Sequence, residues 1–320
     1  MQRTSLEDSD LGVDREALWQ AFAPFALPPS AENDAAWAAG VKKQRKRIFK
    51  NVRRKLLGGG TKVAERTSEI IKDTYNPKWA TGYAKYDPAG AHDNYAPWLW
   101  GERRFMASTN GSARFRHLLI AALIEKLQPK SVLEVGCGNG INLLLLANRF
   151  PEVKFAGVDL TDSGPRLFNE LKQGEGLPGN LAAYAPLPPR DPEGFKRVEI
   201  HQGSAAQLGF ADGSFDLVMS VLALEQMERI RAQALGEMAR VAAKWTLMIE
   251  PFRDVNRYLW PRLNIIRQDY FQGRIDELPQ VGLEPILATD DFPQEIHLRA
   301  CLALCRKAGT QTKAASLAAE

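Results

Sequence analysis

The 320-residue sequence has no run of about 18 apolar residues, the length that a membrane-spanning helix needs. Its start, from Met1 to Asp8, has neither the basic end nor the apolar centre of a signal peptide. Cysteine is scarce, and Cys137, Cys301 and Cys305 form an odd, sparse set that argues against a disulfide framework. No spacing of histidine, cysteine or carboxylate residues matches a metal site. We therefore expect a soluble, metal-free protein of the cytoplasm.

Acidic residues are absent from one strongly basic segment. The net charge is +4, yet residues 42–55 hold nine lysines and arginines and no acid, whereas residues 1–40 hold seven acids and two bases. Apolar residues recur near a helical period and predict a basic amphipathic helix over residues 41–57. They are Val41, Ile48, Phe49, Val52 and Leu56. Three interpretations stay open for this helix: packing on the domain with a solvated basic face, contact with an anionic membrane surface, or contact with RNA.

Residues 1–110 are predicted to form a mainly helical extension before the main domain. We expect one helix near residues 14–23 and otherwise loop up to residue 40. Five of the seven tryptophans precede residue 101, and aromatic residues are dense between residues 75 and 105. This aromatic segment is either a lid over a substrate or the small core of an appended subdomain.

Closely spaced glycines follow a short apolar run in the middle of the chain. Residues 131–135 predict a strand, Gly136, Gly138 and Gly140 a tight turn, and residues 140–149 a helix. Glycine lets the backbone come closer to a ligand than any Cβ would permit, and a helix N-terminus offers free N–H groups and the positive end of its dipole. The segment is typical of an entrance for a nucleotide-like ligand.

Strands and helices are predicted to alternate through the rest of the chain. Helices are expected at 112–127, 163–172 and 223–241, and strands at 153–158, 197–202, 215–220 and 245–250. This alternation predicts an open α/β sheet, mostly parallel, with helices on both faces. Residues 174–194 are rich in proline and glycine and are expected to form a mobile surface loop. The apolar stretches 283–288 and 297–305 predict an antiparallel hairpin, and residues 309–320 a flexible tail.

The sequence contains four motifs that occur in a fixed order in one enzyme class. Residues 136–140 read Gly-x-Gly-x-Gly with Glu134 two places ahead, and Asp159 ends the next predicted strand. Residues 202–220 and the helix end at 237–241, Glu-Met-Ala-Arg-Val, supply the other two motifs. With these motifs the chain resembles the class I S-adenosylmethionine-dependent methyltransferases, particularly the group that contains quinone-biosynthesis and small-molecule enzymes.

The resemblance covers about residues 112–306 and implies a Rossmann-like, seven-stranded sheet with an antiparallel C-terminal hairpin in a domain spanning residues 111–308. It also implies S-adenosylmethionine as the cofactor. Glu134 would support the turn and the amino group, Asp159 would hold the ribose, and Ser204 with Ala205 would flank the adenine. The implied cofactor residues are Glu134, Gly136, Cys137, Gly138, Gly140, Asp159, Leu160, Gly203, Ser204, Ala205, Ser220 and Val221.

Two positions depart from the family's pattern. Ser204 stands where the family usually has aspartate, and Gln226 stands where it often has histidine, which removes a candidate base. The remaining candidates for a catalytic base at the carboxyl edge of the sheet are Glu225 and Glu250, although acids at strand ends also cap helices and hold loops. The histidines are weaker candidates: His92, His117, His201 and His297.

Methyl transfer from a sulfonium needs alignment and exclusion of water, and it needs a base only when the acceptor is a hydroxyl or a protonated amine. The leading hypothesis is a methyltransferase acting on an O, N or C nucleophile of a small-molecule, lipid or glycan acceptor. One alternative is an RNA methyltransferase recruited by residues 42–55, although residues 219–222 lack the Asn/Asp-Pro-Pro-Tyr type of motif that base-amino methylation uses. The other is a non-catalytic scaffold, against which the intact glycine turn and Asp159 count.

Overall fold

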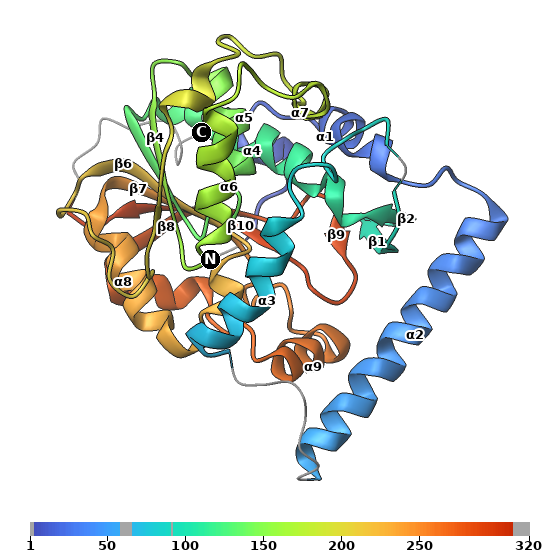
Figure 1. Cartoon of the computed structure of the whole chain (residues 1–320). Coiled ribbons are helices and arrows are strands. Elements are labelled where there is room, and N and C mark those ends of the chain that lie inside the picture. The colour runs from blue at the N-terminus through green and yellow to red at the C-terminus, as the bar shows by residue number, and fades with distance from the viewer. Residues whose placement is uncertain (1–2, 58–65, 91, 310–320) are drawn as a thin grey trace.

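The computed structural model describes residues 3–57, 66–90 and 92–309, and a seven-stranded sheet lies at its centre (Figure 1). The strand order is β5-β4-β3-β6-β7-β10-β8, and β10 runs antiparallel to both of its neighbours. This confirms the predicted sheet and its C-terminal hairpin. The strands are β3 (Ser131–Val135), β4 (Lys154–Asp159), β5 (Glu199–Gln202), β6 (Phe215–Val221), β7 (Ala242–Glu250), β8 (Leu283–Thr289) and β10 (Cys301–Lys307).

Both faces of the sheet are buried, because successive strand residues point to opposite sides. In β6, Leu217 and Met219 join one apolar core, whereas Val218 joins the other. In β10, Leu302 and Leu304 alternate in the same way with Cys301, Ala303 and Cys305. The helices of residues 112–309 are α4 (Ser112–Leu127), α5 (Ile141–Arg149), α6 (Ser163–Lys172), α7 (Gly179–Tyr184), α8 (Arg231–Val241) and α9 (Leu259–Gln268). All three cysteines are buried free thiols.

The N-terminal extension contains the helices α1 (Arg15–Phe22), α2 (Ala31–Leu56) and α3 (Ser68–Ala80). It also contains a hairpin that sequence reasoning missed, formed by β1 (Tyr95–Trp100) and β2 (Arg103–Ser108). The short strand β9 (Gln294–Glu295) pairs with β1 and completes a three-stranded sheet. The link between β8 and β10 is therefore longer than the predicted hairpin turn, and His297 lies in this link rather than in a strand.

The extension shares a core with the main sheet. The ring of Phe22 lies 4.9 Å from that of Trp98 and 5.2 Å from that of Phe115, which belongs to α4. The buried Arg114 of α4 donates its Nε–H to the carbonyl of Ala21 and its Nη1–H to that of Tyr184 in α7, each at 2.6 Å. The proposed domain boundary near residue 110 therefore crosses a continuous core and stays a prediction.

Helix α2 begins ten residues earlier than the predicted 41–57. The side chain of Ser30 caps it by accepting from the backbone N–H of Asn33, and the alanine-rich stretch that follows favours helix. Val41 and Ile48 are buried, but Phe49 is 59% exposed. At 3.6 residues per turn, Phe49 lies about 80° from the stripe that includes Val41, so its assignment to the apolar face was wrong. No helix within the described ranges has the length and apolarity to cross a membrane.

Two further expectations need correction. Residues 174–194 contain α7, whose Leu181 and Tyr184 are fully buried, so this insertion is packed on the body rather than being a free surface loop. The predicted helix 223–241 begins only at Arg231, and short 3-10 turns occupy 224–226 and 228–230. The predicted tail lies, except for Gly309, outside the described residues.

If the extension and the sheet share one core, Phe22→Ala should destabilise the whole protein. Truncation of this fully buried ring should lower the free energy of unfolding by about 3–5 kcal/mol. Chemical denaturation followed by circular dichroism and tryptophan fluorescence should show one shifted transition. Phe49→Ala, at an exposed ring, is the matched control and should change stability by less than about 0.5 kcal/mol. Two transitions, with only one of them shifted, would show that the extension unfolds independently.

Candidate active site

The glycine turn between β3 and α5 lies at the carboxyl edge of the sheet. Gly136, Gly138 and Gly140 all have left-handed backbone conformations, with φ of +78°, +56° and +74°. A Cβ on Gly136 would lie 2.3 Å from the Cβ of Ala223, and one on Gly138 would lie 2.6 Å from the ring of Trp79. The space that a side chain would need is therefore filled by the protein itself. Glycine is required here by backbone conformation and close packing.

Asp159, at the end of β4, is bonded to this turn. Its Oδ2 accepts from the backbone N–H of Gly138 at 2.7 Å, and its Oδ1 accepts from the N–H of Thr161 at 2.9 Å and from the Thr161 hydroxyl at 2.6 Å. The side chain is buried, and Asp159 lines the cavity described below. A carboxylate oxygen can accept two hydrogen bonds, so Oδ2 keeps capacity for a hydroxyl of a ligand.

Glu134, near the end of β3, has one free carboxyl oxygen. Its Oε1 accepts from the side-chain amide of Asn142 at 2.6 Å, whereas Oε2 is buried without a hydrogen-bond partner. Burial raises the pKa of Glu134 to about 8, although the bond from Asn142 favours the charged form. The side-chain Nδ2 of Asn139 is likewise buried and unpaired. Both groups line the same cavity, and each can bond a polar ligand.

The fully buried Glu250, at the end of β7, holds the turn that follows β6. Its Oε1 accepts from the backbone N–H of Ala223 at 3.0 Å and of Leu224 at 3.1 Å, and its Oε2 accepts from that of Glu225 at 3.2 Å. The hydroxyl of Ser220 donates to the same carboxylate. Burial raises the pKa of Glu250, and these donors oppose that rise. Glu250 therefore fixes the backbone of this turn.

The turn presents a pair of buried polar side chains. Glu225 is 7% exposed and Gln226 is 5% exposed. The amide Nε2 of Gln226 donates to Oε1 of Glu225 at 2.7 Å, whereas Oε2 of Glu225 and Oε1 of Gln226 have no hydrogen-bond partner. Burial, and then the nearby charge of Glu250, raise the pKa of Glu225 to about 8. Leu222, in the same turn, has a φ of 50°, an uncommon conformation for a non-glycine residue.

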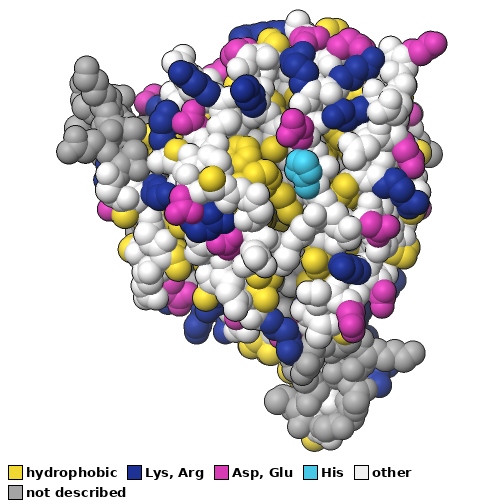
Figure 2. Space-filling view, turned by 60° about the vertical axis from the view of Figure 1, so that its left-hand side comes forward, with side chains coloured by type: hydrophobic (Ala, Val, Ile, Leu, Met, Phe, Trp, Pro, Cys, Tyr) yellow, Lys and Arg dark blue, Asp and Glu magenta, His cyan; other side chains and the backbone are white. Residues whose placement is uncertain are grey.

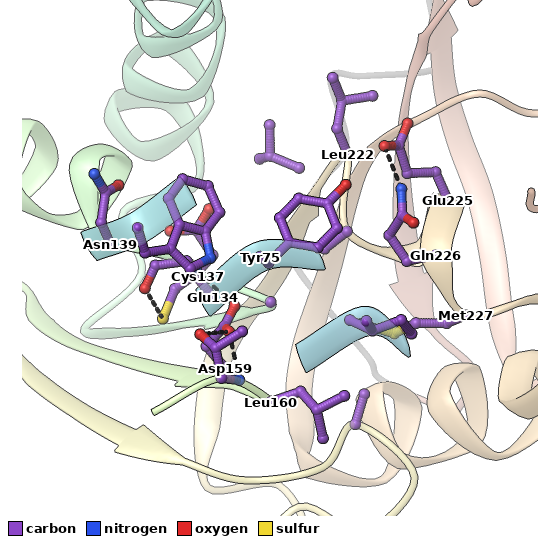
Figure 3. Close-up of a pocket in the computed structure, with 18 of the residues that line it drawn as sticks. Tyr75, Glu134, Cys137, Asn139, Asp159, Leu160, Leu222, Glu225, Gln226 and Met227 are labelled. Atoms are coloured by element: carbon purple, nitrogen blue, oxygen red, sulfur yellow. Dashed lines mark hydrogen bonds between the residues drawn. The ribbon is translucent and has the colours of Figure 1, made fainter. Parts of the chain in front are cut away.

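Helix α3 covers the glycine turn with aromatic side chains. The rings of Tyr75 and Trp79 stack with centroids 5.9 Å apart, and Figure 3 shows Tyr75 between the glycine turn and the pair Glu225–Gln226. Asn76 fastens α3 to the start of α6, since its Oδ1 accepts from the Ser163 hydroxyl at 2.8 Å. Burial raises the pKa of Tyr75. Residues before 80 line the cavity, so the substrate lid stays a prediction, whereas Trp98 lies in the core shared with the main sheet rather than in one of an appended subdomain.

These elements enclose a cavity of about 560 Å³. The structure brings ten of the predicted site residues to its wall and leaves Gly140, Gly203, Ser220 and Glu250 outside it. Gly140 instead caps α5, and Glu250 with Ser220 lies behind the turn. The predicted residues on the wall are Glu134, Gly136, Cys137, Gly138, Asp159, Leu160, Ser204, Ala205, Val221 and Glu225.

Sequence reasoning missed several wall residues that carry no motif. Arg116 of α4 reaches the cavity, and its Nε is buried without a hydrogen-bond partner within the described structure. Lys85 and Met227 also line it, and only the folded topology brings these residues together. Asn139 lies on the wall as well and, unlike these, falls inside the glycine motif. None of the four histidines lies on the wall. Across the described ranges, no group of three or more His, Cys, Asp or Glu side chains is placed to hold a metal ion.

The strand order, the glycine turn after β3 and the acid ending β4 together define a class I S-adenosylmethionine-dependent methyltransferase fold. Residues 133–245 match the family described as "Methyltransferase domain", so the chain carries a methyltransferase domain, and the resemblance seen in the sequence is confirmed. Magnesium protoporphyrin IX methyltransferase from Synechocystis PCC 6803, with bound SAH, superimposes with a TM-score of 0.50 at 12% identity over 75% of this chain and 99% of that one. At that identity the likeness shows the fold alone.

Two curated relatives match parts of the chain. Ajmaline N-methyltransferase of Rauvolfia serpentina is 25% identical over 122 residues, which are 38% of this chain and 35% of that protein. A probable chloroplastic tocopherol O-methyltransferase of Oryza sativa subsp. japonica is 34% identical over 116 residues, which are 36% of this chain and 27% of that protein. The chain therefore matches only about a third of these relatives' length.

Glu250→Ala should destabilise the protein strongly, because it removes the acceptor of three buried backbone N–H groups. A buried donor left without a partner costs about 1–3 kcal/mol, so the free energy of unfolding should fall by about 3 kcal/mol or more. Ser220→Ala removes one donor to the same carboxylate and should cost about 1 kcal/mol. Urea denaturation of both variants makes the comparison. An equal loss in the free energy of unfolding for the two variants would show that the carboxylate of Glu250 does not hold the turn.

Proposed function

We propose that this protein is a methyltransferase that binds S-adenosylmethionine in the cavity beneath α3 and methylates a small molecule bound in the same cavity. The observation that carries the proposal is that one cavity is lined by the glycine turn, by Asp159 and by Glu225, whose buried Oε2 has no hydrogen-bond partner. The fold and the family of residues 133–245 agree with it. When bound, the cofactor would supply an activated methyl group.

The wall residues fit the polar groups of this cofactor. Asp159 keeps acceptor capacity for a ribose hydroxyl, and the unpaired Oε2 of Glu134 can accept from an amino group. The unpaired Nδ2 of Asn139 is a donor, and the first-turn N–H groups of α5 have no acceptor within the helix. Ser204 and Ala205 lie on the wall as the resemblance implies, at the proposed adenine side.

Glu225 is the proposed base of the reaction. Glu225 lines the cavity, its buried Oε2 has no hydrogen-bond partner, and Gln226 orients the carboxyl through its bond to Oε1. With a pKa near 8, this carboxyl can take a proton from a hydroxyl or an ammonium group of the acceptor as the pH rises. Glu250 acts through the backbone as a positioning residue. The acceptor's attacking atom is thus proposed to be an oxygen or a nitrogen.

A small-molecule acceptor fits the enclosure better than RNA does. Tyr75 and Trp79 cover the glycine turn and leave apolar, aromatic surface for the acceptor. The names of the two curated relatives, methyltransferases of ajmaline and of tocopherol, point to the same class of acceptor. Residues 42–55 do not line the cavity, so their partner is a separate question from the identity of the acceptor.

Asp159→Ala should weaken binding of S-adenosylmethionine and S-adenosylhomocysteine by at least about 30-fold, because it removes a buried, charged acceptor. Isothermal titration calorimetry measures both affinities. Asp162→Ala, an exposed acid three residues along and outside the cavity, is the matched control and should bind as the unchanged protein does. If the unchanged protein bound neither compound, the hypothesis that it is a methyltransferase would be refuted and the non-catalytic scaffold would be favoured.

A second experiment assigns the class of the acceptor by following a labelled methyl group from the cofactor into fractionated lysate. Label in RNA would support the alternative hypothesis of an RNA methyltransferase.

Glu225→Gln should lower kcat by about 10²–10⁴-fold and should also alter the pH profile. Because Glu225 must be deprotonated to act, kcat/KM of the unchanged enzyme should rise with pH through about 8. The glutamine variant should lose this rise, whereas Glu225→Asp should keep it at a reduced rate. An unchanged kcat and an unchanged profile in Glu225→Gln would exclude Glu225 as the proton acceptor.

A further inference from the structure

The large apolar side chains that are exposed in the described structure gather on two neighbouring helices. Helix α2 runs beside the body of the molecule, and α9 packs against it (Figure 1). Every large hydrophobic side chain that is at least 36% exposed lies on one of these helices or on the residue next to it. They are Phe49 (59%), Leu57 (70%), Tyr258 (57%), Leu259 (65%) and Ile266 (36%). Such clustering marks an interaction site rather than chance exposure.

Two hollows that share residues join three of these side chains, Phe49, Tyr258 and Leu259, into one surface. Phe49 and Trp260 line a hollow of about 340 Å³, and Trp260 also lines a groove of about 880 Å³ with Tyr258 and Leu259. Arg45 borders both, and its guanidinium lies 5.4 Å from the centroid of the Trp260 ring. We call this the α2/α9 surface. Its residues are Lys42, Arg45, Lys46, Phe49, Tyr258, Leu259 and Trp260.

The charge on the C-terminal half of α2, from residue 42 onward, is of one sign, whereas Glu32 and Asp34 lie in its first turn. Residues 42–55 hold nine bases and no acid, and Lys42, Arg45, Lys46, Lys50 and Arg53 are exposed. By contrast, the face drawn in Figure 2 mixes both signs, with small groups of hydrophobic side chains between them. Cations that surround exposed apolar side chains are typical of helices that lie in the interface of an anionic membrane.

We propose that the α2/α9 surface docks the protein on a bilayer of anionic phospholipid. Phe49, Tyr258 and Leu259 enter the boundary between headgroups and acyl chains, and the basic side chains of α2 bind the phosphates. Aliphatic side chains such as Leu259 favour lipid over RNA, because nucleic acid binds cations and aromatic stacking platforms. The docking goes beyond the proposed function and does not depend on methyl transfer.

The docked surface lies close to the cavity rim. Arg66, which lines the cavity, donates its Nε–H to the carbonyl of Gln268 at 3.3 Å, and its backbone N–H to Asp269 at 3.2 Å. Leu259 of the α2/α9 surface begins α9 and Gln268 ends it, and at ten residues the helix spans about 15 Å. Docking through α9 therefore brings the cavity within one short helix of the lipid.

Vesicle sedimentation tests the proposal with the full-length protein. It should bind vesicles of phosphatidylcholine mixed with phosphatidylserine and should not bind phosphatidylcholine alone. Since each basic residue near an anionic surface changes partitioning by about fivefold, a variant with Lys42, Lys46, Lys50 and Arg53 replaced by glutamine should bind about 100-fold more weakly or worse. Its control carries the same change at exposed sites elsewhere, Lys130, Lys154, Arg166 and Arg190, and should bind as the unchanged protein does.

A second variant separates lipid from RNA. Phe49→Ser with Leu259→Ser keeps every charge and should weaken vesicle binding by about tenfold or more, while leaving any affinity for a labelled RNA oligonucleotide unchanged. Circular dichroism and cofactor affinity verify that each variant is folded. The proposal is overturned if the unchanged protein ignores anionic vesicles, if it binds neutral vesicles equally well, or if this apolar variant binds vesicles normally. RNA binding that depends on the four bases, without vesicle binding, would assign the surface to RNA instead.

Discussion

One buried carboxylate organises the carboxyl edge of the sheet. Glu250 accepts hydrogen bonds from the Ser220 hydroxyl and from three successive backbone N–H groups, and those donors offset the cost of burying a charge. The three N–H groups belong to residues 223–225. The carboxylate therefore fixes the path of the chain after β6, where Leu222 has a left-handed conformation. That path puts Glu225 and Gln226 on the cavity wall, each with an unpaired oxygen.

The opposite wall depends on the N-terminal extension. The ring of Trp79 fills the space that a Cβ at Gly138 would need, and the hydroxyl of Tyr83 donates to the carbonyl of Asn139 at 2.7 Å. The extension is therefore bonded to the same turn that is proposed to hold the cofactor. A change in the position of α3 would alter both the turn and the aromatic wall, which couples enclosure of the acceptor to binding of the cofactor.

Much of the sheet and of the cofactor wall could be predicted from the sequence, because local pattern determines both. Apolar runs end in Glu134 and Asp159, and the spaced glycines report a backbone that needs positive φ. Contacts between segments that are distant in the sequence produce no local pattern from which they could be predicted. The sequence does not show that Arg116 reaches the cavity or that Glu250 lies behind the turn, since both depend on how helices and strands pack. The β1–β2 hairpin was missed because its aromatic residues fit a lid as well as a strand.

The family match does not identify the acceptor, because part of the cavity wall comes from residues outside the matched region. The family match covers residues 133–245, which supply the glycine turn, Asp159 and Glu225. Tyr75, Trp79 and Arg116 lie before that region, line the same cavity and are proposed to contact the acceptor. Helix α2 belongs to the same N-terminal part of the chain. The proposed acceptor contacts and the proposed membrane contacts thus both involve residues outside the region that matches the family, and Trp79 of α3 links the first of them to the glycine turn.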